Sequence, residues 1–257
     1  MIGAVGSDEF GPSLIQGLQR DGIDTSRIRE VSGQTTGVAV IIVEESTGEN
    51  RILFNPGANH FLQPSHFKSP SDLGDPLPDL IIMQLEISMA TVLQILKTAE
   101  AAGVHILLNP APAVEIPDDA YTAITHLIVN ESEAAILTGR KTVDVEADDF
   151  DWAVVAKEFL KRGVKNIVVT LGSKGAFFAS AEQPEGVYVR AEKVKRVVDT
   201  TAAGDTFVGA YAVSVVRKGG KGAVGEEDVK RACRAAGKTV EKTGAQSAIP
   251  WADEVDC

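Results

Sequence analysis

Short aliphatic runs and amphipathic helical patterns alternate along most of this 257-residue chain. The runs predicted as strands are 2–5, 80–83, 104–108, 126–129 and 166–171, and the helical patterns between them cover 12–20, 88–101, 131–137 and 151–161. Continuous aliphatic strands separated by helices are typical of a parallel sheet that is covered on both faces. We therefore expect an α/β fold with a mostly parallel central sheet.

Two segments depart from this alternation. Residues 37–43 and 51–54 are strand-like and are separated by a segment of turn composition, which predicts a hairpin outside the main sheet. Residues 176–179 and 187–189 predict an antiparallel extension of the sheet, and helices are expected at 203–217 and 226–242.

The charge balance argues against two classes of partner. The chain has 25 Lys and Arg against 36 Asp and Glu, a formal charge of −11, whereas nucleic acids and anionic membranes attract basic clusters. Its two cysteines, Cys233 and Cys257, have no metal-type or disulfide-rich spacing, and no apolar run approaches the ~20 residues of a membrane span. We expect a cytoplasmic protein that binds neither nucleic acid nor membrane.

Polar residues follow four of the predicted strands. Glu86, Asn109, Asn130 and Thr170 lie at or just after their carboxyl ends. Ligands of open parallel sheets bind at this edge. Any one of these residues alone also fits a turn or a helix cap, so the argument depends on their gathering at one edge.

The most informative segment runs from Val197 to Phe207, where a short β run leads through small residues into Gly204, Asp205 and a long predicted helix. Free amides at a helix start carry partial positive charge and bind phosphate, and Gly204 allows close approach. The alternative to an anion site is that Asp205 is simply an Asp in the first turn of an ordinary helix.

Residues 220–225 formally fit G-x-G-x-x-G, but they follow a helix, so they do not predict a dinucleotide site.

In this order, the motifs resemble the ribokinase family of PfkB-type carbohydrate kinases. Residues 199–207 (D-T-T-A-A-G-D-T-F) match that family's highly specific C-terminal signature. Further similar segments are 35–39, 55–59, 84–86, 108–113, 130–134, 170–175, and 244–246 with 249–251, so the resemblance covers essentially the whole chain. It implies a single domain over residues 1–257, a three-layer αβα sandwich with a small β lid at about 36–54.

The resemblance also implies ATP-dependent phosphorylation of D-ribose to D-ribose 5-phosphate. Asp205 would be the general base, and Ala202, Ala203 and Gly204 would form the anion hole. ATP would contact Asn130, Thr170, Gly172, Ser173 and Gly204. Asn130 and Glu133 would organise Mg²⁺ through water, Asp199, Thr201 and Gly244 would help bind K⁺, and Glu86 would contact the sugar.

The chain departs from the family pattern in two places. Ala248 stands where the family has a serine near the K⁺ site, although Ser247 could substitute for it. The family's N-x-D strand and G-G-K-G-A-N-Q-A loop, which hold the sugar, are not in the sequence. We therefore expect Met1 to be an internal methionine, and the first sheet strand and part of the lid to be missing. Two alternatives remain: another sugar or nucleoside kinase, and a non-catalytic nucleotide-binding fragment. The resemblance also implies a homodimer that forms through the lid.

Overall fold

The computed structural model describes residues 1–43, 50–145, 147, 149–219 and 224–256. These divide into two compact units, one formed by residues 1–68 and 86–95 and the other by 69–85 and 96–257. Each unit is described by itself below. The expectation of a single domain over the whole chain stays a prediction.

The larger unit is built on a six-stranded sheet in the order β10-β9-β8-β7-β6-β5. Its strands are β5 (Leu80–Met83), β6 (His105–Leu108), β7 (His126–Asn130), β8 (Asn166–Thr170), β9 (Ala176–Ser180) and β10 (Val187–Val189). Strands β5 to β8 are parallel, whereas β9 and β10 extend the sheet antiparallel. This confirms the predicted α/β fold with a mostly parallel central sheet.

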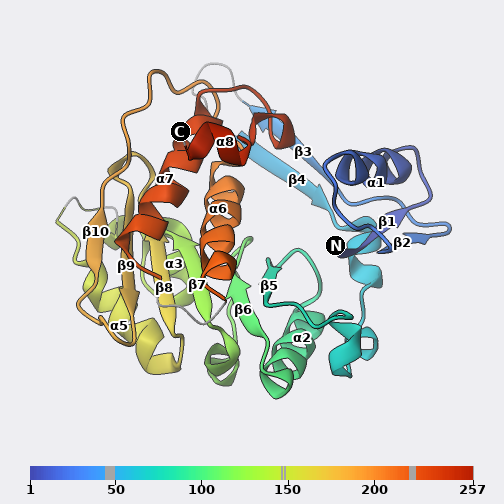
Figure 1. The fold of residues 1–257 in the computed structure, drawn as a ribbon, viewed down its shortest axis with the longest axis horizontal. Coiled ribbons are helices and arrows are strands. Elements are labelled where there is room, and N and C mark those ends of the chain that lie inside the picture. Colours follow the sequence, from blue (N-terminus) through green and yellow to red (C-terminus); the bar gives the residue numbers. More distant parts are fainter. Residues whose placement is uncertain (44–49, 146, 148, 220–223, 257) are drawn as a thin grey trace. The chain divides into compact units, whose positions relative to one another are not determined.

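Some helices of the larger unit lie in the connections between strands, and the last three follow the final strand, β10. The helices of this unit are α3 (Glu131–Leu137), α4 (Thr142–Val145), α5 (Trp152–Arg162), α6 (Ala203–Arg217), α7 (Glu226–Val240) and α8 (Ala252–Val255), together with part of α2 (Met89–Ala102). Short 3₁₀ turns are η3 (Pro70–Asp72), η4 (Asp118–Ala123), η5 (Gly172–Lys174) and η6 (Gln246–Ala248). Helices α6 and α7 lie side by side over one face of the sheet (Figure 1).

Both faces of the sheet are buried at β6 to β9, which explains why these strands are rich in apolar residues. Val168 and Phe178 pack in one cluster with Tyr211 of α6 and Val229 of α7. Successive residues of a strand point to opposite faces. Ile167, the neighbour of Val168, is also fully buried, and α5 contacts β8 and β9. This double cover keeps the sheet rigid and fixes the positions of the loops at its edge.

The smaller unit contains two short sheets. In the first, β1 (Ile2–Gly6) and β2 (Arg27–Val31) are parallel and are connected through α1 (Phe10–Arg20). In the second, β3 (Val38–Val43) and β4 (Asn50–Asn55) pair antiparallel, which confirms the two strands predicted outside the main sheet, while the predicted turn at 44–49 lies outside the described residues. Their role as a lid stays a prediction. The unit also holds the 3₁₀ turns η1 (Gly57–Phe61) and η2 (Pro64–His66).

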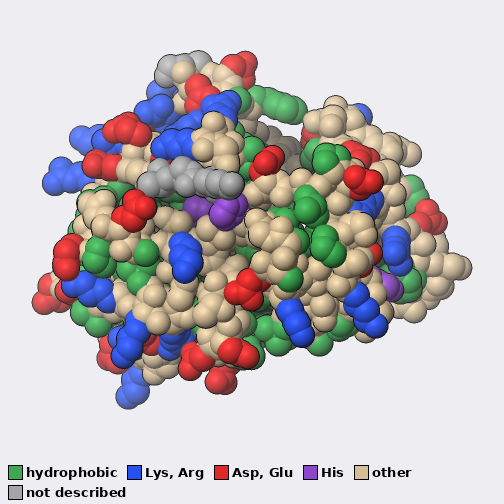
Figure 2. Space-filling view, turned by 60° about the horizontal axis from the view of Figure 1, so that its bottom comes forward, with side chains coloured by type: hydrophobic (Ala, Val, Ile, Leu, Met, Phe, Trp, Pro, Cys, Tyr) green, Lys and Arg blue, Asp and Glu red, His purple; other side chains and the backbone are tan. Residues whose placement is uncertain are grey.

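The surface carries charges of both signs. Figure 2 shows Lys and Arg interspersed with Asp and Glu on the face that it presents. Some of these groups form ion pairs, such as Arg234 with Glu192 at 2.8 Å and Lys157 with Glu185 at 2.7 Å. In the part of the chain that the structure describes, no helix has the length and apolar character needed to span a membrane.

Candidate active site

Helix α6 begins directly after a residue in the left-handed conformation. Ala202 is its N-cap, with φ 60° and ψ 8°, and no other non-glycine among the described residues has a positive φ. Such a conformation costs about 1–3 kcal/mol and persists only where the surroundings fix it. Here the Ala202 carbonyl accepts hydrogen bonds from both the amide and the hydroxyl of Thr206, each at 2.9 Å.

The first turn of α6 offers unpaired amides. Ala203 donates its N–H to the Thr200 carbonyl at 3.3 Å, but the amides of Gly204 and Asp205 have no acceptor within the described segments. A Cβ added at Gly204 would meet no atom within 4 Å, so the space in front of it is open. Open amides at the positive end of a helix dipole suit a phosphate group. The geometry fits the predicted anion hole, and the Asp205 amide is a further open donor beside it.

The Asp205 side chain lies in the same turn. It is exposed, and none of the residues that the structure describes donates a hydrogen bond to its carboxylate. It lies in the first turn of α6, at the positive end of the helix dipole. An ionised carboxylate that no protein donor occupies can accept a proton from a ligand hydroxyl.

Asp199 connects the loop before α6 to the loop after α7. One carboxylate oxygen accepts the Thr201 amide at 2.9 Å, and the other accepts the Gly244 amide at 3.0 Å. The hydrogen bonds from Thr201, and then that from Gly244, hold the pKa of the Asp199 carboxyl below its usual value. The structure therefore brings together the three residues predicted at the K⁺ site.

The departure at Ala248 also has a structural context. Ala248 is fully buried, in the 3₁₀ turn η6. A Cβ placed on Gly244 would lie only 2.5 Å from the Ser247 hydroxyl oxygen, so Ser247 packs directly against the Gly244 loop. A hydroxyl is thus present beside this loop despite the alanine at 248.

Asn130 and Glu133 form a reciprocal cap at the start of α3. The Asn130 side-chain oxygen accepts the Glu133 amide, and a Glu133 carboxylate oxygen accepts the Asn130 amide, both at 2.8 Å. Burial raises the pKa of Glu133, although the bond from the Asn130 amide partly opposes it. One carboxylate oxygen remains for another partner, which suits a Mg²⁺ ion that keeps most of its waters and takes few protein ligands.

Thr170 lies opposite Asn130 in the register of β7 and β8, as expected for parallel strands that end at one edge. The turn that follows carries Gly172 and Ser173 within η5, and it closes with a hydrogen bond from the Leu171 amide to the Gly175 carbonyl at 2.8 Å. The structure therefore confirms the predicted proximity of Asn130 and Thr170 but does not test their contact with a nucleotide.

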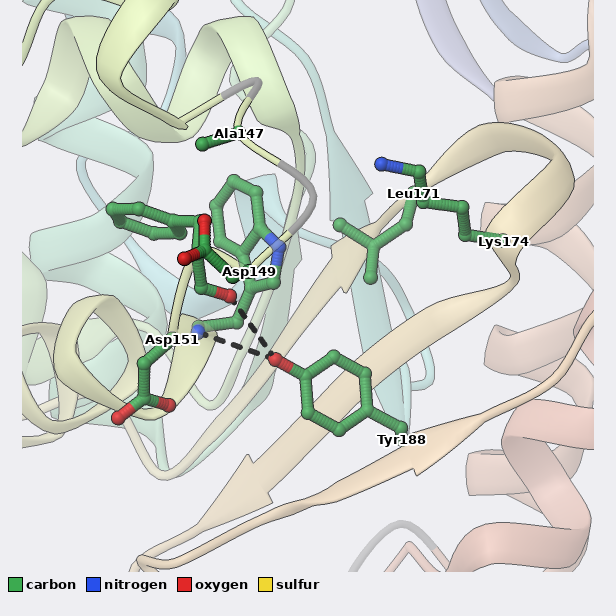
Figure 3. A pocket seen from close by; sticks show the side chains of 8 residues that line it. Ala147, Asp149, Asp151, Leu171, Lys174 and Tyr188 are labelled. Atoms are coloured by element: carbon green, nitrogen blue, oxygen red, sulfur yellow. Dashed lines mark hydrogen bonds between the residues drawn. The ribbon is translucent and has the colours of Figure 1, made fainter.

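A cavity of about 310 Å³ lies beside this turn (Figure 3). Leu171 and Lys174 line one side of it, and Asp149 and Asp151 line the other. Tyr188 accepts the Trp152 amide at 3.4 Å and donates to the Phe150 carbonyl at 3.3 Å. None of the predicted ATP contacts lines this cavity, so it is a neighbour of the candidate site.

Asn109 and Glu86, which were also predicted at the ends of strands, are not among the residues gathered above. Asn109 follows β6 and donates its side-chain amide to the Ile128 carbonyl at 2.9 Å, which makes it a link between β6 and β7. Glu86 belongs to the smaller unit, so its role stays a prediction. Sequence reasoning missed the left-handed Ala202, because alanine carries no signal for that conformation.

Comparison with known proteins identifies relatives over nearly the full chain. The family described as "pfkB family carbohydrate kinase" matches residues 1–252. The chain is 40% identical to the ribokinase of Schizosaccharomyces pombe, covering 100% of itself and 78% of that protein, and 35% identical to a deoxyribokinase of Salmonella typhi, covering 97% and 78%. The structure of Arabidopsis thaliana ribokinase complexed with ribose and ATP is similar with a TM-score of 0.86 at 31% identity, covering 99% and 79%.

Proposed function

The chain belongs to the pfkB family of carbohydrate kinases and is a sugar kinase, and we propose that it transfers a phosphoryl group from ATP to D-ribose, forming D-ribose 5-phosphate. The observation that carries this proposal is the start of α6, where the open amides of Gly204 and Asp205 adjoin the unpaired Asp205 carboxylate. Phosphoryl transfer needs positioning and charge stabilisation more than covalent help from the protein.

In this proposal Asp205 is the general base. Its carboxylate accepts the proton of the sugar's primary hydroxyl as that oxygen attacks the terminal phosphorus of ATP. The anion hole of Ala202, Ala203 and Gly204, together with the Asp205 amide, stabilises the charge on the transferring group. The left-handed Ala202 supports this role, because it directs the chain into the helix, where the Gly204 and Asp205 amides have no acceptor among the described residues.

ATP is proposed to bind along the ends of β7 and β8. Asn130, Thr170, Gly172 and Ser173 line this edge, and Gly204 receives the terminal phosphate. Asn130 and Glu133 would hold Mg²⁺ through water. The ion, when bound, neutralises charge on the phosphate oxygens. The protein's own contribution is to fix both side chains through their reciprocal cap.

Asp199, Thr201 and Gly244 are proposed to hold K⁺. A monovalent cation held there would supply positive charge beside the loop that precedes α6. The hydrogen bonds of the Asp199 carboxylate tie the two contributing loops together, which supports this assignment. Ser247 supplies the hydroxyl that Ala248 lacks.

The β3–β4 ribbon is proposed as the sugar lid and as a dimer contact. Val40 pairs with Leu53, and their side chains are 52% and 61% exposed, while Phe54 points to the other face and is 47% exposed. The ribbon thus has apolar side chains on both faces. We assign one face, together with Glu86, to binding of the sugar, and the other face to contact with a second copy of the chain. The proposed location is the cytoplasm.

A coupled assay of ADP release with Mg²⁺ and K⁺ tests the substrate. D-ribose should give saturable turnover. 2-deoxy-D-ribose is the sharpest competitor because one relative is a deoxyribokinase. Preference for deoxyribose, or for a nucleoside, would replace D-ribose as the substrate. Nucleotide binding without turnover on any sugar would favour the alternative of a non-catalytic nucleotide-binding fragment.

A further inference from the structure

A chain of two hydroxyl groups connects α7 to the left-handed residue at the start of α6. Thr239 of α7 donates its hydroxyl to the Thr206 hydroxyl oxygen at 2.8 Å. Thr206 in turn donates its own hydroxyl to the Ala202 carbonyl at 2.9 Å. Each hydroxyl has one proton, so the Thr239 donor leaves the Thr206 proton available for Ala202.

The two threonine hydroxyls are shielded from water. Thr239 is fully buried and Thr206 is 4% exposed, so water cannot readily replace either bond. Thr239 has only one other acceptor among the described residues, the Ala235 carbonyl at 3.3 Å. Losing the Thr239 hydroxyl would leave Thr206 with an unfilled lone pair in a dry environment, where its rotamer would no longer be fixed.

The C-terminal end of α7 also binds the start of the loop that precedes α6. The Val240 carbonyl accepts the amides of Val198 at 2.7 Å and Asp199 at 3.3 Å. Residues 239 and 240 therefore form hydrogen bonds at both ends of the segment 198–206, which runs from the loop into the first turn of α6. The segment between those ends contains Ala202, Ala203 and Gly204, the proposed anion hole.

We propose that Thr239 is a positioning residue for phosphoryl transfer. Its hydroxyl orients Thr206, which holds Ala202 in the left-handed conformation and so keeps the Gly204 and Asp205 amides directed at the transferring group. This inference rests on the proposed kinase function. Because the amides matter most when charge develops, Thr239 affects binding of the transition state more than binding of the nucleotide.

Three variants test the proposal. Thr239→Val keeps the shape of the side chain and removes the hydroxyl, Thr239→Ser keeps the hydroxyl, and Ser214→Ala removes another buried hydroxyl of α6 that donates to Ala210 at 3.3 Å. With Mg²⁺ present, the affinity for ADP alone is compared with that for ADP plus aluminium fluoride, a mimic of the transferring group. Hydrogen exchange of the amides in 199–207 is measured in parallel.

We expect Thr239→Val to weaken ADP–aluminium fluoride binding by about tenfold while ADP binding changes by less than about twofold. Amide exchange in 199–207 should quicken. Thr239→Ser should restore both properties, and Ser214→Ala should leave both unchanged. Equal loss of ADP and ADP–aluminium fluoride binding, or no change in either, would overturn the proposal.

Failure of the kinase function would appear differently. The wild-type chain would then bind aluminium fluoride no better with ADP than without it. Hydrogen exchange would still decide the role of Thr239 in that case. Faster exchange in Thr239→Val supports the link from Thr239 to Ala202, and unchanged exchange contradicts it.

Discussion

The Gly244 amide donates a hydrogen bond of 3.0 Å to the carboxylate of Asp199, which lies 45 positions earlier in the chain. This bond joins the loop after α7 to the loop before α6. It also makes the geometry of Gly244 part of the candidate site, because the Asp199 carboxylate is shared with the Thr201 amide.

Gly244→Ala should damage this connection. Gly244 has φ 107°, and an added Cβ would lie 2.5 Å from the Ser247 hydroxyl oxygen. A side chain in that conformation costs about 1–3 kcal/mol before any clash is counted. We expect a lower free energy of unfolding in urea and a higher K⁺ concentration for half-maximal activity. An unchanged K⁺ dependence would contradict the assignment of Gly244 to the cation site.

The turn after β8 provides a matched pair of glycines. Gly175 has φ 103°, and an added Cβ would lie 2.0 Å from the Val189 carbonyl oxygen, whereas a Cβ on Gly172, at φ 54°, would meet nothing within 4 Å. Gly175→Ala should therefore cost about 3 kcal/mol or more, and Gly172→Ala about 1 kcal/mol. Urea unfolding of both variants measures the difference. Equal costs would show that backbone crowding does not determine this turn.

His126 should make stability depend on pH. Burial, and secondarily the charge of His105, lowers the pKa of His126 from 6.5 to about 4. The unfolded chain therefore binds a proton more readily than the folded one as the pH falls below 6.5. The contribution of neutral His126 to the free energy of unfolding is fully present above about pH 6.5. It is lost progressively as the pH falls toward 4, by about 3 kcal/mol in total.

His126→Phe isolates this contribution. The His126 ring accepts or donates a hydrogen bond with the buried Tyr211 hydroxyl at 2.9 Å, so the variant should be less stable than wild type at pH 7. Its stability should fall less steeply between pH 6.5 and 4. Identical slopes for the two proteins would show that His126 does not titrate as described.

The sequence was sufficient to predict the elements whose burial pattern is strong. Strands β5 to β8 are aliphatic on both faces, and the predicted residue ranges agree with the structure to within one or two residues. Strand β2 was missed because Arg27, Arg29 and Glu30 interrupt its apolar residues. Helices α4 and α8 have four residues each, which is too short for a helical period to be visible.

The residues of the candidate site could be predicted from the sequence, but the contacts that position them could not. Asn130 and Thr170 follow predicted parallel strands, so topology predicted that they lie at one edge of the sheet, whereas Asp205 was singled out by the motif at a helix start. The bond between Thr206 and Thr239 was not predictable, because it joins residues 33 positions apart on two packed helices. The left-handed Ala202 depends on that tertiary contact and not on any local preference of alanine.

The most direct test of the account is Asp205→Asn, which removes the base and nearly preserves size. Sugar phosphorylation should fall by about 10³-fold, because general-base catalysis contributes about 10²–10⁴-fold, while the dissociation constant of ADP should change by less than about twofold. Turnover within tenfold of wild type, with unchanged ADP binding, would contradict the role of Asp205 as the base.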